Sequence, residues 1–369
     1  MKLAFIGWRG MVGSILLDRM TTLSDLKNYE MDLFSTSQAG RKGPTIEDRE
    51  FTLKDAYDLE ELKKYDVILT CQGSEYTQKV YPRIKNENWN GYWVDAASLL
   101  RMDSDSIICL DPVNDELIKE SLSKNVKTFV GGNCTVSLML MALNGLFENN
   151  CVEWVSSMTY QAASGAGAKN MIELIKQMKF LGETGEDIIK NDKGIIEIDQ
   201  KISESLNHQL FPKDSFGHPL AGNLLPWIDV PVEFGMSKEE WKGMTETNKI
   251  LNTDKVIPVD GTCVRVGAMR SHSQALTIKL TKDVPIDEIC QMIDEANDWA
   301  NVIPNEKEET LKNLTPAKVS GTMNIPVGRL RKMRMGDEYL NAFTVGDQLL
   351  WGAAEPLRRM VNIIREHIN

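Results

Sequence analysis

The sequence lacks the features that mark several large classes of protein. Its 369 residues include only six cysteines and four histidines, and none of these form a CxxC pair or a cluster with zinc-ligand spacing, so no metal site is expected. No run of 18 or more apolar residues is present, so we expect no membrane-spanning helix. The first residues also lack the pattern of a secretion signal, and a cytoplasmic protein is expected.

Positive charge is also in short supply. Lys and Arg number 42 against 53 Asp and Glu, which gives a formal net charge of −11. Binding of nucleic acid or of an anionic membrane requires a basic face, so we expect neither partner. An anionic small molecule remains compatible, because a few cations in one pocket do not show in a net charge. The cysteines are scattered singly, as free thiols are in a reducing compartment.

Two sequence textures divide the chain near residue 132. Before it, short β-branched or aromatic runs such as "LAFIG", "MDLFS" and "DVILTC" alternate with helical patterns, which is typical of parallel strands with crossover helices. After it, the strand-like runs lengthen, as in "EWVSSMTYQAAS" and "HSQALTIKLT". The predicted fold class is α/β, with a Rossmann-like dinucleotide-binding domain over residues 1–132 and a second, α+β domain over residues 133–347 on a mostly antiparallel sheet.

Two further segments are polar or terminal. Residues 182–207 are mixed in charge and weakly patterned, and we predict a surface excursion with some helix. Residues 348–369 have apolar side chains at helical spacing. This last helix is expected to be kinked at Pro356 and to return to the first domain, completing it.

A glycine triplet follows the first predicted strand. Gly7, Gly10 and Gly13 in "GWRGMVGS" lie where a helix begins, and glycine there lets the pyrophosphate of a dinucleotide approach backbone N–H groups. Close packing of strand on helix is the alternative reason for such glycines. The position right after the first strand favours dinucleotide binding.

The end of the second predicted strand indicates which dinucleotide is bound. It reads "FSTSQAGRKG", with hydroxyls at Ser35, Thr36 and Ser37 and no acidic residue. An acid would hold the ribose of NAD and repel a 2′-phosphate, so NADP is favoured, with Arg9 of the glycine loop nearby. For Arg41 and Lys42, a solvated loop explains the charges almost as well.

Cys134 has an unusual setting for a cysteine. It follows "GGN" and directly precedes an apolar helical run expected to begin at about Thr135. A thiol at a helix N-terminus is expected to be stabilised as a thiolate, with backbone amides pointing into the same space. The other cysteines fit small buried side chains better.

A reactive thiol needs a proton partner, and His272 is the candidate. It lies between two strand-like runs of the second domain, whereas His208, His218 and His367 lie in polar or terminal sequence and fit solvated side chains. Arg265 lies among apolar strand residues, where a cation requires a partner: a substrate carboxylate or a structural salt bridge. Glu239 and Lys242 lie at i, i+3 of a predicted helix, where an exposed ion pair is the alternative to a site role.

Several blocks together carry a family resemblance. The segments "FIGWRGMVGS", "GGNCTVSLMLMAL", "TYQAASGAG", "EEWKG", "VDGTCVRVGA" and "AFTVGDQLLWGAAEPLRRM" closely resemble those of bacterial aspartate-β-semialdehyde dehydrogenases. The resemblance extends from end to end and is weakest over residues 182–210 and 41–50, to which no role is transferred.

The resemblance implies an NADP-dependent, phosphorylating dehydrogenase without a metal. It would interconvert L-aspartate 4-semialdehyde, phosphate and NADP with L-aspartyl-4-phosphate and NADPH, in the biosynthesis of lysine through diaminopimelate, methionine, threonine and isoleucine. The second domain would be catalytic and form a homodimer. The implied catalytic residues are Cys134 as nucleophile, His272 as acid/base and Gln161, which also orients the substrate.

The resemblance also implies the binding residues. Arg265 and Glu239 would hold the two charged ends of the amino acid, and Arg101, Asn133 and Lys242 would hold phosphate. The implied cofactor contacts are Gly7, Arg9, Gly10, Met11, Val12, Gly13, Thr36, Ser37, Gln72, Ser164, Gly165, Ala166, Gly167, Ala168 and Gln348.

Three other functions would use part of the same set of residues. A papain-like cysteine hydrolase would explain a Cys and a His far apart in sequence, but the papain context around the cysteine is absent and such an enzyme has no use for a dinucleotide fold. A non-catalytic redox sensor would leave Gln161, Arg265 and His272 unexplained. A relative that reduces another acyl phosphate, such as N-acetylglutamyl phosphate, stays within the same class.

Overall fold

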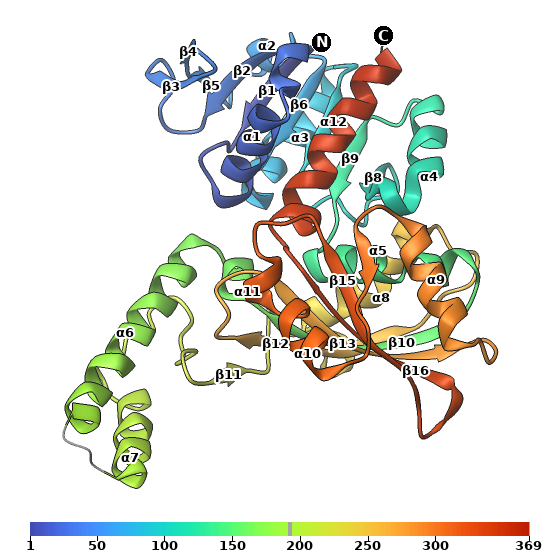
Figure 1. Cartoon of the computed structure of the whole chain (residues 1–369). Helices are drawn as coiled ribbons and strands as arrows, with labels where there is room; N and C mark the ends of the chain where they lie inside the picture. Colours follow the sequence, from blue (N-terminus) through green and yellow to red (C-terminus); the bar gives the residue numbers. More distant parts are fainter. Residues whose placement is uncertain (191–193, 369) are drawn as a thin grey trace.

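The computed structural model describes residues 1–190 and 194–368. In these residues, two seven-stranded sheets and one two-stranded hairpin are present. Figure 1 shows the sheets one above the other, with the first part of the chain in blue and cyan at the top and the second sheet below. The predicted fold class, a Rossmann-like parallel sheet followed by a mostly antiparallel one, is confirmed.

The first sheet is parallel in every described pairing and has the strand order β5-β2-β1-β6-β7-β9-β8. Its strands are β1 (Lys2–Ile6), β2 (Glu30–Ser35), β5 (Lys54–Asp55), β6 (Val67–Thr70), β7 (Tyr92–Asp95), β8 (Ser106–Cys109) and β9 (Thr128–Gly131). The strand order reverses at β1, between β2 and β6. In such sheets the crevice beyond the strand ends at the reversal is where ligands bind.

Helices cover both faces of this sheet, because its strands are apolar on both sides. They are α1 (Met11–Thr22), α2 (Leu59–Leu62), α3 (Ser74–Asn86), α4 (Asp111–Ser123) and the C-terminal α12 (Glu355–Ile368), with a 3₁₀ turn η1 (Asp25–Asn28) and a hairpin of β3 (Lys42–Ile46) and β4 (Arg49–Thr52) at one edge. In Figure 1 the red α12 lies beside the blue strands and α1, although it is the last element of the chain.

Ion pairs fix the C-terminal helix to the first elements of the chain. Glu355 bonds Arg19 of α1 at 3.0 Å, and Arg358 bonds Asp25 at 2.7 Å. Pro356, at which a kink was expected, is the second residue of α12 and has no N–H to donate to the turn before it. The irregular turn comes before it, as the π-helical turn η4 (Leu350–Ala354).

The second sheet has the order β11-β12-β10-β13-β16-β15-β14. Only the β10–β12 and β14–β15 pairings in it are parallel among the described residues. Its strands are β10 (Val152–Gln161), β11 (Leu224–Leu225), β12 (Val259–Val266), β13 (His272–Leu280), β14 (Ala300–Val302), β15 (Ile325–Met333) and β16 (Gly336–Gly346).

One face of the second sheet is covered by helices and the other is more open. The helices are α5 (Cys134–Glu148), α8 (Lys238–Leu251) and α9 (Ile286–Ala296), with the short α10 (Lys307–Asn313), α11 (Pro316–Val319), and 3₁₀ turns η2 (Ala163–Ala166) and η3 (Glu233–Gly235) in the connections. Helix α5 is buried along nearly its whole length, between the two sheets. On β10, buried Thr159 and Gln161 alternate with exposed Met158 and Tyr160.

A helical arm projects from the second sheet. It consists of α6 (Ala168–Lys190) and α7 (Ile195–Leu206), which pack on each other and extend away from both sheets in Figure 1. Residues 182–207 are thus more helical than predicted, apart from residues 191–193, which lie outside the described residues. Ion pairs at i, i+4, such as Lys179 with Glu183, support helix in a polar sequence. The arm exposes Ile172 and Ile175.

Candidate active site

A cleft of ≈460 Å³ lies between the two sheets. It is lined by side chains from both halves of the chain: Arg101, Asn133, Cys134, Gln161, Asp229, Glu239, Lys242, Arg265 and Gln348 are among them. Eight of these nine are candidates from the sequence, and the fold brings them together although they are spread over most of the chain.

Cys134 is the first residue of α5, one position before the predicted start. Asn133 caps this helix, with its Oδ1 accepting from the backbone N–H of Thr135 at 3.0 Å and of Val136 at 3.2 Å. The turn η4 approaches from the other side so closely that a Cβ on Gly352 would lie 2.8 Å from the Cys134 Cβ. The thiol is therefore held at a fixed point, half-buried at the base of the cleft.

Burial works against the expectation that this thiol rests as a thiolate. Burial raises the pKa of Cys134 to about 12, and the Glu239 carboxylate adds to the rise, while Arg265, Arg101 and Lys242 oppose it. The position at a helix N-terminus was predictable from the sequence. The carboxylate beside it was not, because Glu239 is far away in the sequence and its approach depends on the tertiary fold.

Three candidates meet at one corner of the second sheet. Gln161 ends β10 and lies opposite Arg265 on the parallel neighbour β12, while His272 begins the antiparallel β13. The backbone of Ala162 bonds two of them: its carbonyl accepts from Arg265 Nη1 at 2.7 Å, and its N–H donates to His272 Nδ1 at 3.0 Å. Within the described residues Arg265 has no carboxylate within ion-pair distance, so the structural salt bridge considered for it is not formed.

The imidazole of His272 is fully buried and neutral. Burial lowers its pKa to about 3, with the Arg265 charge acting in the same direction. Because Nδ1 accepts a hydrogen bond, the neutral ring carries its proton on Nε2. Among the described residues no group bonds Nε2.

Gly165 leaves room for both of these side chains. A Cβ at this position would lie 2.8 Å from Arg265 Nη1 and 3.1 Å from His272 Nε2. Any larger residue would therefore push into the groups that face the cleft. Gly165 itself lines the cleft, so His272 Nε2 lies directly behind the cleft wall.

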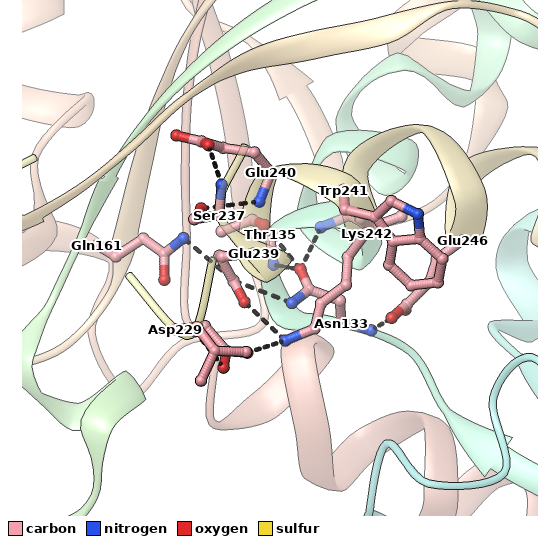
Figure 2. Close-up of polar contacts among 12 residues, drawn as sticks. Asn133, Thr135, Gln161, Asp229, Ser237, Glu239, Glu240, Trp241, Lys242 and Glu246 are labelled. Atoms are coloured by element: carbon pink, nitrogen blue, oxygen red, sulfur yellow. Dashed lines mark hydrogen bonds and ion pairs between the residues drawn. The ribbon is translucent and has the colours of Figure 1, made fainter. Parts of the chain in front are cut away.

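The helix α8 presents a row of charged side chains to the other side of the cleft (Figure 2). Glu239 accepts from Asn133 Nδ2 at 2.9 Å and from Gln161 Nε2 at 3.2 Å, and its other oxygen bonds Lys242 Nζ at 3.0 Å. Burial opposes ionisation, but Lys242 and these hydrogen bonds hold the pKa of Glu239 below its usual value. The pair is buried, so the exposed ion pair considered from sequence is not what forms.

Lys242 has a second carboxylate partner that the sequence did not indicate. Asp229, in the loop before α8, bonds Lys242 Nζ at 2.9 Å. Burial acts against the lysine charge, yet Glu239 and Asp229 together raise the pKa of Lys242 above its usual value. Lys242 is thus charged and paired on two sides. Its nearness to Asp229 follows only from the loop geometry.

Arg101 reaches the cleft from the loop between β7 and β8. Its Nε donates to the Gly131 carbonyl at 2.7 Å and its Nη1 bonds Glu246 Oε1 at 3.1 Å. Glu246 was also missed. The available signal was its place at i+7 from Glu239, on the same face of an amphipathic helix.

The candidate cofactor residues fall into two hollows. The first, at the strand-order reversal, is lined by Gly7, Arg9, Gly10, Ser35, Thr36, Ser37 and Gln72, together with Trp8, which the sequence did not indicate. Val12, Ser164, Gly165 and Gln348 line the cleft beside Cys134. Gln348 is held there by bonds to Ser271 N and Ser164 Oγ.

The remaining cofactor candidates surround these hollows. Met11 and Gly13 lie in the first turn of α1, and a Cβ on Gly13 would lie 2.1 Å from the Gly7 carbonyl oxygen. Ala166, Gly167 and Ala168 form the turn between η2 and α6, where Gly167 has a φ of +99°. None of these five residues lines either hollow.

Of the other cysteines, Cys71 lines the first hollow, and none of the other cysteines or histidines lines the cleft. Cys109, Cys151 and Cys263 are buried. His208, His218 and His367 are exposed. In residues 1–190 and 194–368 no group of three or more His, Cys, Asp and Glu side chains has a metal-binding arrangement. Over the same residues no helix is long and apolar enough to span a bilayer.

Comparisons with known proteins show the family of this chain. The family model for the semialdehyde dehydrogenase NAD binding domain matches residues 2–121, and that for the semialdehyde dehydrogenase dimerisation domain matches residues 143–351. The structure of aspartate semialdehyde dehydrogenase from Francisella tularensis is 48% identical with a TM-score of 0.95, covering 99% of this chain and 100% of that one. The chain belongs to the aspartate-semialdehyde dehydrogenase family.

More distant members share the fold. Aspartate semialdehyde dehydrogenase II from Vibrio cholerae, complexed with ASA, is 22% identical with a TM-score of 0.80, over 99% of this chain and 98% of that one. The enzyme from Candida albicans with NADP is 17% identical with a TM-score of 0.66, over 99% of each chain. As a member of this family, the chain is an oxidoreductase with a nicotinamide-cofactor domain.

Proposed function

We propose that this chain is an NADP-dependent aspartate-semialdehyde dehydrogenase that forms and consumes L-aspartyl-4-phosphate through a thioester on Cys134. The observation that carries the proposal is the meeting of Cys134 and Arg265 with the cations Arg101 and Lys242 in one cleft, with His272 directly behind the cleft wall at Gly165. A thiol, a proton donor and sites for two anionic groups are what an acyl phosphate of an amino acid requires.

The cofactor hollow fits a dinucleotide phosphate. A Cβ on Gly7 would lie 2.5 Å from the Cys71 carbonyl carbon, so only glycine allows the close turn. Gly10 is the N-cap of α1 and offers no side-chain cap, which leaves backbone N–H groups for a pyrophosphate. The hydroxyls of Ser35, Thr36 and Ser37, with Arg9 nearby, suit a 2′-phosphate. Bound NADPH would supply the hydride.

In the reductive direction Cys134 would attack the acyl carbon of aspartyl phosphate. The C–S bond forms as the C–O bond to phosphate breaks, the thiol proton leaves with the phosphate, and Arg101 and Lys242 stabilise the departing dianion. Attack requires the thiolate. Because the pKa of the resting thiol is raised, we propose that Arg265 and Lys242 favour its ionisation as Glu239 becomes engaged by the substrate ammonium.

His272 would act from Nε2. The proton there lies beside Gly165 at the cleft wall. It would be shared with the oxygen of the reacting carbonyl and returned to Nε2 when the hemithioacetal collapses to aldehyde and thiolate, which then takes up a proton from solvent. The Ala162 N–H fixes the ring in the required tautomer. Gln161, bonded to Glu239, would orient the substrate.

Arg265 and Glu239 would select an amino acid. Arg265 is bonded to a carbonyl and keeps its charge for the α-carboxylate, while Glu239 would receive the α-ammonium. Binding both ends fixes the acyl carbon near sulfur. Acetylglutamyl phosphate carries no ammonium, so the buried carboxylate of Glu239 disfavours that substrate.

We also propose a homodimer joined through the second domain. The exposed sheet face with Met158 and Tyr160 and the arm with Ile172 and Ile175 offer apolar area to a second copy. Sedimentation equilibrium would then give about twice the chain mass of 41.6 kDa. A monomer at micromolar concentration would contradict this part.

The domain assignment and the setting are proposals as well. Residues 1–132 with α12 would form the NADP-binding domain, and residues 133–347 the catalytic and dimerisation domain. The six cysteines are all unpaired, which suits a cytoplasmic enzyme. The product would supply lysine, methionine, threonine and isoleucine biosynthesis.

The test is oxidation of L-aspartate semialdehyde, followed by NADPH absorbance with and without phosphate. We expect NADPH formation only with phosphate, and slower reduction of NAD than of NADP. Turnover with N-acetylglutamate semialdehyde instead would contradict the substrate. Equal rates without phosphate would contradict the phosphorylating chemistry.

A further inference from the structure

We infer that Glu246 is a positioning residue for phosphate: it holds Arg101 and the segment before Cys134 in the arrangement that the phosphate step needs. This inference rests on the proposed function and adds a residue that contacts no substrate.

Glu246 lies behind the site. Its side chain is 2% exposed, and it is absent from the residues that line the cleft, whereas Glu239 and Lys242 on the same helix face line it. Figure 2 shows its carboxylate directed at the backbone of Asn133. Any effect of Glu246 on chemistry must therefore pass through other groups.

Both carboxylate oxygens are used, and each bonds a different part of the site. Oε2 accepts the Asn133 N–H at 2.6 Å, and Oε1 bonds Arg101 Nη1 at 3.1 Å. Asn133 is the N-cap of α5 and immediately precedes Cys134. Glu246 thus connects α8 with the candidate phosphate arginine and with the loop that carries the nucleophile.

The rest of the local network strengthens this connection. Arg101 Nε donates to the Gly131 carbonyl at 2.7 Å, and the Asn133 side chain reaches Glu239 at 2.9 Å. The segment 131–133 is therefore held from both sides by charged groups. Arg101 is left with one terminal nitrogen, Nη2, that forms no hydrogen bond with the described residues, which is the atom available to an anion.

A glutamate is required here for a chemical reason. Two donors converge on Glu246, so both of its terminal atoms must be acceptors. Glutamine has the same shape but one NH₂, which would face either the Asn133 N–H or the Arg101 guanidinium, donor against donor. It would also leave Arg101 buried without its counter-charge.

The decisive variant is Glu246→Gln, assayed as phosphate-dependent oxidation of L-aspartate semialdehyde. We expect the KM for phosphate to rise about tenfold to a hundredfold, the range for losing a charge-assisted hydrogen bond. The KM for NADP should change less than twofold. The inference would be overturned if Glu246→Gln impaired kcat and every KM to the same extent, or if its KM for phosphate equalled that of the wild type.

Glu240→Gln is the matched control. Glu240 lies on the same helix and its carboxylate also accepts two backbone N–H groups, from Ser237 at 2.7 Å and Cys263 at 3.1 Å, but it does not touch Arg101 or Asn133. It should lower the melting temperature without raising the phosphate KM. If it raises the phosphate KM as much as Glu246→Gln does, Glu246 has no special role.

A double-mutant cycle with Arg101→Gln tests the route of the effect. If Glu246 acts through Arg101, adding Glu246→Gln to that variant raises the phosphate KM by less than twofold. Full additivity would overturn the route. Should Glu246→Gln not fold, Glu246→Asp keeps the charge but is too short to reach both donors, and a phosphate-selective rise in KM is again expected.

A readout without turnover separates this inference from the proposed function. Phosphate should raise the melting temperature of the wild type, and more weakly that of Glu246→Gln. A wild type without phosphate-dependent turnover would count against the proposed function. If the wild type shows phosphate-dependent turnover and stabilisation by phosphate, and Glu246→Gln gives the same values in both assays, the result would count against the role of Glu246 alone.

Discussion

On the second-sheet side of the cleft, Arg265 and His272 are bonded to the backbone of Ala162. On the α8 side, Arg101 and Lys242 are bonded to carboxylates. A backbone carbonyl or N–H fixes orientation without cancelling charge, so the first pair is fixed and chemically available. A carboxylate cancels the charge of its partner, so phosphate must share or displace one.

Two of the carboxylates that bond the phosphate cations, Glu246 and Asp229, differ in the same way. The Glu246 side chain is 2% exposed and bonds two groups, whereas that of Asp229 is 32% exposed and bonds Lys242 from a loop. We expect Glu246 to stay in place and Asp229 to yield. The contacts of Ala162 and Glu246 would then be fixed, and the Asp229–Lys242 pair would be the exchangeable contact.

The largest effect is expected for the nucleophile. Cys134→Ser should fold and bind NADP, yet lose about three orders of magnitude or more of turnover, because an oxygen nucleophile replaces sulfur. The assay is semialdehyde oxidation, with mass spectrometry to detect the thioester. Cys290→Ser, on α9, is the control and should stay active. An active Cys134→Ser would remove the thioester.

Next comes the fixed proton donor. His272→Gln should lower kcat by about a hundredfold or more, since it removes the Nε2 proton donor. His218→Gln, at an exposed position, should leave kcat unchanged.

The same residue determines a pH dependence. A lowered pKa means that His272 protonates only at strongly acid pH, near 3, so it stays neutral through pH 5–8. The wild-type rate should therefore show no break near the ordinary histidine value of about 6.5. A break there that disappears in His272→Gln would show that the imidazole titrates normally.

A smaller effect is expected for the fixed cation. Arg265→Lys should raise the KM for the semialdehyde about tenfold to a hundredfold, because a point charge cannot replace the planar fork, which bonds the Ala162 carbonyl and would bond the substrate carboxylate as well. The KM for NADP, measured in the same assay, is the internal control. Equal changes in both constants would move Arg265 out of the amino-acid site.

The smallest effect tests the exchangeable contact. Asp229→Asn should lower the phosphate KM about twofold to fivefold, because phosphate no longer competes with a partly exposed carboxylate for Lys242. Asp260→Asn, at an exposed position on β12, should leave it unchanged. A higher phosphate KM in Asp229→Asn would mean that Asp229 supports phosphate binding.

The sequence predicted those parts of the site that depend on local pattern. Cys134 follows from the turn before an apolar helix, and the dinucleotide loop from glycines after a strand. The charged residues of α8 could be located from the sequence. Predicting a role for Glu246, however, requires knowing which face of this helix is buried. The role of Asp229 could not be predicted, because its contact with Lys242 depends on the conformation of a loop and not on the periodicity of a helix or strand.

The resting state of the thiol shows the same limit. A helix N-terminus predicts a low pKa, but burial and Glu239 raise it. Both depend on how α8 packs against α5. The sequence pattern of a single helix and its preceding turn therefore locates Cys134, whereas the protonation state of its thiol depends on contacts between helices.

The most direct test is a structure of the protein with phosphate bound. We expect phosphate between Arg101 and Lys242, with Asp229 moved beyond hydrogen-bond distance from its present 2.9 Å, and with the bonds of Ala162 and of Glu246 unchanged. Phosphate bound with the Asp229–Lys242 pair intact, or with Glu246 displaced instead, would contradict the division into fixed and exchangeable contacts.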